Sequence, residues 1–134
     1  MSLRSCKKAF SMIELIFVIA ILAIIGAVAV PKLLDSRNSA VISTIKQDVS
    51  TITTSVQSYY MLEGSISKIT DAVNINENSW SVSDNKVEFS DNSKSCITIE
   101  VSGTQLKVVI LENSTELCKE IYNEGVRSVT YELF

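Results

Sequence analysis

The distribution of apolar and polar residues divides the chain into two unlike parts. From Phe10 to Val30 the sequence runs for 21 residues with one charged side chain, Glu14. At ~1.5 Å of rise per residue, a helix of this length spans about 30 Å, which is roughly the thickness of a bilayer core. The pattern therefore predicts a membrane-spanning helix over residues 10–31.

After residue 36 the apolar positions become periodic. They recur at spacings of three and four and form one stripe of a helix: Ile42, Ile45, Val49, Ile52, Val56 and Tyr59. Such a stripe is typical of a helix whose apolar face lies on another surface. We therefore expect an amphipathic helix over residues 32–63, with Gly64 as its stop.

The remaining residues, 64–134, alternate apolar and polar side chains as half-buried strands do. The strand-like segments are 80–82, 86–90, 96–102, 105–111 and 126–134, with a helical turn near 68–73. Gly103 marks a hairpin, and a short helix is expected to begin at an Asn113 cap and to stop at Gly125. The predicted fold is α+β, a long N-terminal helix packed on a small antiparallel sheet in a globular head.

Two residues of the apolar segment need an explanation. A carboxylate near the hydrocarbon boundary costs about 2–3 kcal/mol on insertion scales. Glu14 is therefore expected either to have a cationic partner or to reach back to headgroups and water. Pro31 removes a backbone donor and crowds the carbonyl near Ala27, which predicts a kink in a continuous helix. The alternative is that Pro31 marks the end of the membrane segment.

Charge is distributed unevenly around the apolar segment. Residues 1–9 carry Arg4, Lys7 and Lys8 and no acid, a bias that predicts a cytoplasmic N-terminus and a head on the other side of the membrane. Without residues 1–9 the formal net charge falls from −3 to −6. An acidic head argues against direct nucleic-acid binding, which requires a surplus of lysine and arginine.

The order of these features resembles the class III signal of type IV pilins and type II secretion pseudopilins. The resemblance rests on the basic leader, the small residue Ala9, the run Phe10–Leu15 (FSMIEL) and Pro31. It implies that residues 1–9 are a leader removed by prepilin peptidase between Ala9 and Phe10, and that Phe10 is then N-methylated. It also implies that Glu14 takes part in subunit docking. Ala9 departs from the family, which usually has glycine at this position.

The resemblance further implies a pilin-like structural subunit and not an enzyme. Such a subunit would lie in the bacterial inner membrane with its head in the periplasm, and would assemble into a periplasmic or extracellular filament for protein secretion, adhesion or DNA uptake. The implied partners are prepilin peptidase, an inner-membrane platform protein, an assembly ATPase and the same or related pilins. No cofactor is expected.

A second processing site is present in the same segment. Ala27-Val28-Ala29 fits the pattern cut by ordinary signal peptidase, which would release a periplasmic binding or adaptor domain that begins at Val30. Glu14 disfavours this alternative, because an ordinary signal core does not need an acid at its entrance.

The three cysteines are divided between the expected leader and the head. Cys6 lies in the expected leader, which leaves Cys96 and Cys118 in the head. An even pair in an oxidising compartment favours a disulfide, and two free core thiols are the alternative.

Catalytic chemistry has few candidates in this sequence. The chain has no histidine and no glycine-rich phosphate loop, so histidine-based acid–base catalysis is excluded and phosphate cradling of that kind is not indicated. Asp84, Glu88 and Asp91 could bind a cation, but they do not have the spacing of a calcium loop. A solvated acidic face is therefore the favoured interpretation, and no metal site is expected.

Overall fold

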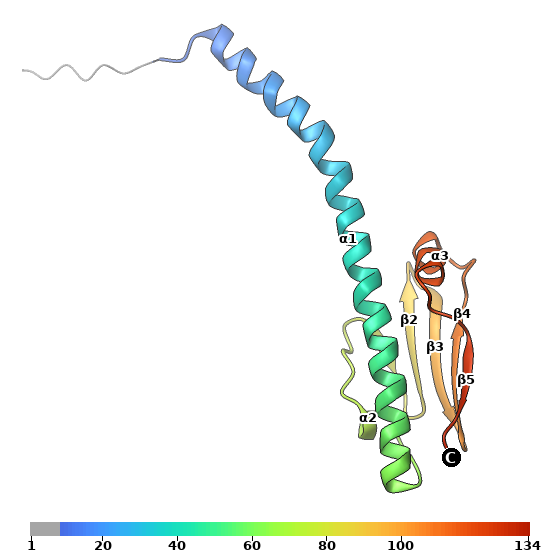
Figure 1. Ribbon diagram of the computed structural model, residues 1–134. Helices are drawn as coiled ribbons and strands as arrows, with labels where there is room; N and C mark the ends of the chain where they lie inside the picture. The colour runs from blue at the N-terminus through green and yellow to red at the C-terminus, as the bar shows by residue number, and fades with distance from the viewer. Residues whose placement is uncertain (1–8) are drawn as a thin grey trace, which may run out of the picture. The chain divides into compact units, whose positions relative to one another are not determined.

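The computed structural model describes residues 9–134, and Figure 1 shows its elements. Their order is α1 (Met12–Glu63), α2 (Ile69–Ala72), β1 (Trp80–Val82), β2 (Lys86–Asp91), β3 (Lys94–Ser102), β4 (Gln105–Ile110), α3 (Glu116–Asn123) and β5 (Val129–Glu132). The chain forms two compact units, one up to Arg37 and one over Asn38–Phe134. The predicted α+β class is confirmed.

The first unit consists of the N-terminal part of α1. Helix α1 is continuous through Pro31. Between Ala9 and Arg37 every residue except Gly26 is exposed, including the large apolar side chains. Among the described residues α1 is the one helix long and apolar enough to cross a membrane, and its most apolar window is entirely unburied. Such a surface requires a cover of lipid or protein.

In the second unit, α1 buries four of the six residues of the predicted apolar stripe, and Val49 and Tyr59 are half-buried. Ile45, Ile52 and Val56 are 2%, 3% and 0% exposed, and they belong to the hydrophobic core that the sheet shares. Figure 1 shows this part of α1 lying along the sheet. The spacing of three and four residues therefore predicted the buried face correctly.

The sheet is an antiparallel meander in the order β1-β2-β3-β4-β5. Apolar residues face each other across β3 and β4 on the buried side: Ile97 pairs with Ile110, Ile99 with Val108, and Val101 with Leu106. Each pair removes two side chains from water and fixes the register, because a shift by one residue would expose them. The two edge strands are short, three residues in β1 and four in β5.

The two turns that flank β3 contain residues with positive φ. Gly103 joins β3 to β4 with φ +58°, as its position in the sequence predicted. The turn from β2 to β3 was not predicted as a tight hairpin, and there Asn92 and Ser93 both have positive φ. Asparagine tolerates this conformation better than most residues, which is why a turn without glycine forms here.

Several predicted boundaries differ from the structure by one to three residues, and two of these differences have a clear physical reason. Helix α3 is capped by Thr115, not Asn113: residues 111–114 form a turn, and the Thr115 hydroxyl accepts a hydrogen bond from the backbone N–H of Cys118. The last strand begins at Val129, not at residue 126. Val126 is instead buried beside α3 and donates its N–H to the carbonyl of Ile121, which closes the end of that helix.

Burial of the α1 stripe should dominate the stability of the head. We expect Ile52→Ala to lower the free energy of unfolding by about 2–5 kcal/mol, because it leaves a cavity between α1 and the sheet. Ser58→Ala, at an exposed position of the same helix, should stay within about 0.5 kcal/mol. Urea unfolding of the full chain in detergent micelles measures both, and equal effects would contradict this account of the core.

Candidate functional site

The predicted processing site lies where the first helix begins. Ala9, Phe10 and Ser11 are not helical, and α1 starts at Met12. The Ser11 hydroxyl accepts a hydrogen bond from the backbone N–H of Glu14 at 3.3 Å, and its carbonyl accepts one from Leu15 at 3.1 Å. Ser11 is therefore the N-cap of α1. The peptide bond between Ala9 and Phe10 lies outside the helix, in exposed backbone.

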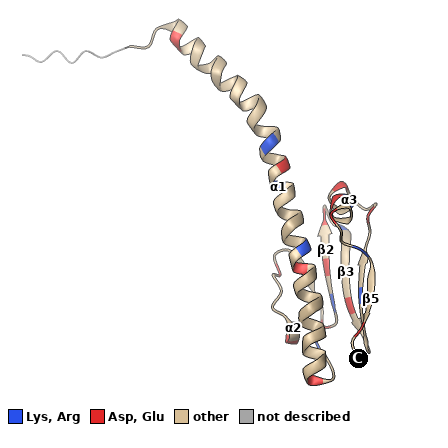
Figure 2. Ribbon diagram, viewed as in Figure 1, with Lys and Arg blue, Asp and Glu red and all other residues tan. Residues whose placement is uncertain are grey.

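Glu14 occupies the third helical position after this cap. An acid there faces the positive end of the helix dipole, so the carboxylate is favoured at this place even without a partner. Figure 2 shows acidic colour at the start of α1 followed by a long uncharged stretch. Within residues 9–134 no lysine or arginine lies in ion-pair distance of Glu14. The carboxylate is thus open to a cation from outside the described chain.

Sequence reasoning missed Ser11, although a signal for it exists. The spacing of Ser11 and Glu14 is that of a capping box, in which serine or threonine is followed three residues later by an acid. That pattern assigns to the Phe10–Leu15 run a local structural role in addition to its resemblance to a signal.

Comparison with known families identifies this segment. Residues 4–30 match the family described as the prokaryotic N-terminal methylation motif. The chain carries a class III prepilin signal. This signal is the one found in type IV pilins and pseudopilins, so the resemblance stated from the sequence is confirmed, and the motif supports a precursor of pilin or pseudopilin type. No curated protein and no solved structure matches the chain.

The class III prepilin signal covers the apolar segment and not the head. Its match begins at Arg4 and ends at Val30, one residue before Pro31. Both Ala9 and Phe10 lie inside it, as does Glu14. The head has to be understood from its own contacts.

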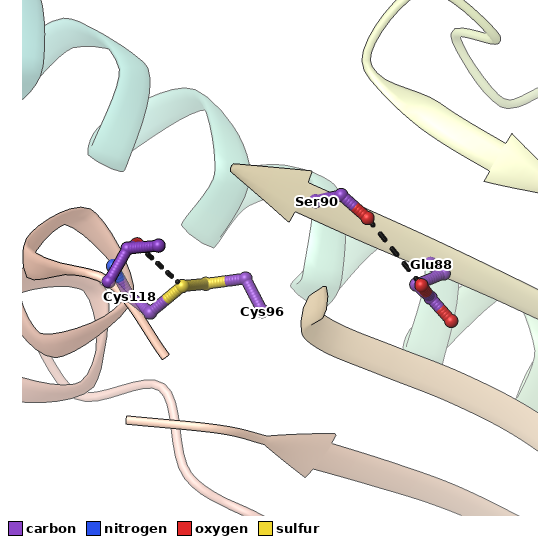
Figure 3. The surroundings of a disulfide bond; sticks show 5 residues. Glu88, Ser90, Cys96 and Cys118 are labelled. Atoms are coloured by element: carbon purple, nitrogen blue, oxygen red, sulfur yellow. Dashed lines mark hydrogen bonds between the residues drawn. A yellow bond between two sulfur atoms is a disulfide. The ribbon is translucent and has the colours of Figure 1, made fainter. Parts of the chain in front are cut away.

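In the head, Cys96 of β3 and Cys118 of α3 are joined by a disulfide (Figure 3). Their Cα atoms are 5.5 Å apart, and both residues are fully buried. The Thr115 hydroxyl, which caps α3, also lies 3.1 Å from the Cys118 sulfur. The bond attaches α3 to the central strand of the sheet. Cys6, the third cysteine, lies outside the described residues.

Two acids of the β1–β2 region form ion pairs with lysines of the same head. Asp84 lies 3.6 Å from the ammonium of Lys68, and Glu88 lies 3.2 Å from that of Lys86. Figure 3 also shows the hydroxyl of Ser90 donating to Glu88. Within residues 9–134 no group of three or more histidine, cysteine or acidic side chains is placed to hold a metal ion.

The sequence did not predict a hydrogen bond that connects α1 to the sheet. The indole of Trp80 is 1% exposed, and its Nε1–H donates to Asp48 Oδ2 at 3.0 Å. Because the donor and acceptor are 32 residues apart in the chain, no local pattern predicts the pair. Trp80 packs at a tilt on Phe89, with ring centroids 5.7 Å apart.

Removing the disulfide should destabilise the head without a change of fold. We expect the double variant Cys96→Ala/Cys118→Ala to lose about 2–4 kcal/mol of unfolding free energy, because the unfolded chain regains the freedom of a 22-residue loop. Denaturation with and without a reductant measures the loss. Reductant should destabilise the wild type and leave the double variant unchanged, and a wild type insensitive to reductant would contradict the prediction.

The Ser11 cap should be visible in hydrogen exchange. Ser11→Ala removes the acceptor of the Glu14 N–H, at a cost of about 1 kcal/mol, so exchange at that amide should quicken roughly fivefold. Ser11→Thr retains a hydroxyl and should exchange nearly as slowly as the wild type. Amide exchange on the full chain in detergent micelles provides the measurement, and equal protection in Ser11→Ala would show that the cap does not hold the helix start.

Proposed function

We propose that the protein is a structural subunit of a type IV pilus or a type II secretion pseudopilus. The observation that carries the proposal is the methylation motif at residues 4–30, which covers the first part of α1, where the most apolar window of the helix is unburied. Lipid covers such a surface before assembly, and the matching helices of other subunits cover it afterwards. The work of the chain is to bind copies of itself or its relatives, and no reaction is assigned to it.

In this proposal, prepilin peptidase cuts the precursor between Ala9 and Phe10 and methylates the new amine of Phe10. The exposed, non-helical backbone on both sides of that bond supports the assignment, because a peptide bond inside a helix would first have to unwind. The small side chain of Ala9 fits the requirement of the family for a small residue before the cut.

Glu14 then supplies the charge that directs docking. The amine of Phe10 stays cationic after a single methylation, and the carboxylate of Glu14 has no cationic partner within the described chain. An ion pair between the amine of one subunit and Glu14 of the next removes the cost of an acid among apolar helices. We propose that this pair fixes the register of the first helices in the filament.

Pro31 contributes a weak point in the same helix. Its ring leaves the carbonyl near Ala27 without a helical donor, although α1 continues through it. We propose that the helix bends or loosens here as subunits leave the bilayer and pack into a fibre.

The remaining assignments follow from the same family. Residues 1–9 are the cytoplasmic leader, residues 10–31 the membrane and filament-core helix, residues 32–63 the amphipathic helix, and residues 64–134 the periplasmic head. An inner-membrane platform protein and an assembly ATPase are the partners that would extract the subunit and extend the filament.

The mature N-terminus tests the proposal directly. Mass spectrometry of the protein from cells that contain a prepilin peptidase should find a chain that starts at Phe10 and carries one extra methyl group. A chain that starts at Val30 would support release by ordinary signal peptidase and overturn the proposal.

Assembly tests the role of Glu14. Glu14→Ala should lower incorporation into sheared filaments at least about tenfold, because an unpaired amine would be left among the packed helices. Asp35→Ala, at an exposed acid of the same helix, is the matched control and should assemble as the wild type does. Normal incorporation of Glu14→Ala would remove Glu14 from the docking account.

A further inference from the structure

An open groove of about 240 Å³ lies in the head between α1 and the β4–β5 edge of the sheet. Its walls combine apolar side chains with two cations. The residues used below are Lys46, Val49, Val108, Gly125, Arg127 and Val129. Val129 is 39% exposed, so part of this apolar side chain is open to a partner. No acidic residue lines this groove.

Both cations of the groove are available to a partner. The ammonium of Lys46 lies 4.0 Å from the position that a side chain at residue 125 would take, and Gly125 leaves that space empty. Arg127 is held in place, because its guanidinium stacks 3.8 Å from the ring of Tyr122 and donates to the carbonyls of Tyr122 and Val126. Within residues 9–134, neither cation lies in ion-pair distance of an acid.

This positive groove belongs to an acidic domain. Residues 38–134 carry seven lysines and arginines against 13 acids. Two of these acids, Glu116 and Glu120, are exposed and lie one turn apart on α3, and Glu124 caps the end of that helix. None of the three lies within ion-pair distance of a lysine or arginine in the described chain. Lys119 is exposed between them, so the acidic face of α3 has a net charge of −2.

We propose that the groove is a docking site for the acidic face of α3 from a second copy of the chain. Lys46 and Arg127 of one subunit receive Glu116 and Glu120 of the next, and the valines of the groove add apolar contact beside the ion pairs. The proposal rests on the proposed function and adds to it a contact between heads. Charge complementarity selects this occupant: the groove presents two cations and no acid, and α3 presents an excess of acids.

The positions of the two surfaces are also compatible with the growth of a filament. The groove and the acidic face are different patches of one domain, so the contact joins unlike surfaces. Contacts of this kind generate open helical assemblies when the rotation between subunits does not close a ring. Because Arg127 is already held by Tyr122, little of its side-chain freedom is lost on docking.

Zero-length cross-linking of the full chain tests the contact. Equal amounts of ¹⁴N-labelled and ¹⁵N-labelled chain are reconstituted in neutral phosphatidylcholine vesicles, which exclude anionic lipid as the occupant, and treated with a carbodiimide. The expected product is a mixed-isotope peptide in which the amine of Lys46 is joined to Glu116 or Glu120. A product found only within single-isotope chains, or none at Lys46, overturns the proposal.

Charge reversal supplies the second measurement. Lys46→Glu/Arg127→Glu and Glu116→Lys/Glu120→Lys each remove one of the two groups that the carbodiimide joins, so neither variant alone should give a mixed-isotope product between positions 46 and 116 or 120. Mixing the two reversed variants should restore it, which a variant that had lost its fold could not do. Lys94→Glu/Lys107→Glu changes the net charge equally at exposed positions outside the groove and should leave the yield unchanged. Failure of the mixture to restore the product overturns the proposal.

The two proposals fail in different ways. A chain that is methylated at Phe10 and enters filaments, yet gives no product between Lys46 and α3, leaves the proposed function in place and overturns the head contact. Loss of the methylated start overturns the proposed function, while a mixed-isotope product in vesicles still supports the head contact.

Discussion

The structure depends on a single constraint, the burial of the apolar surface of α1. Over its first part the helix is apolar on every side, and no residue of the described chain covers it. Leaving such a surface in water costs free energy that grows with its area, so the helix requires a cover of either lipid or other apolar helices. The proposed life of the protein, first in a bilayer and then in a fibre, consists of exchanging one of these covers for the other.

Within the second unit the apolar surface of the same helix is covered in a different way. There the apolar residues are confined to one face, and that face lies on the sheet with the buried side chains of β3 and β4 against it. The hydrogen bond from the indole of Trp80 to Asp48 adds a directional link between α1 and the sheet, and the disulfide adds a covalent link between β3 and α3. Apolar contact drives α1 onto the sheet, and the hydrogen bond between Trp80 and Asp48 helps to fix their relative position.

The features that could be predicted from the sequence are those that repeat along the chain with the period of a helix or a strand. The stripe from Ile42 to Tyr59 and the alternation of Ile97, Ile99 and Val101 gave the helix face and the strands, because burial repeats with the period of each element. The boundaries at Thr115 and Val129 were missed for different reasons: a local turn over residues 111–114 delays the start of α3, and Val126 is buried beside α3 instead of joining the last strand. The groove could not be predicted from the sequence either, because Lys46 and Arg127 come to line one groove only after α1 and the sheet have packed. Ser11 was the exception, a local signal that the sequence carried and that the stronger resemblance obscured.

The short edge strands have a consequence for the proposed assembly, which would hold the heads at high density. Heads that share a membrane or a fibre meet one another constantly, and a long open sheet edge would offer unpaired amides and carbonyls to any neighbouring strand. With three residues in β1 and four in β5, the head exposes only brief edges to such pairing. Crowded subunits are thereby protected from joining sheet to sheet into amyloid-like aggregates, and their encounters are left to the side chains.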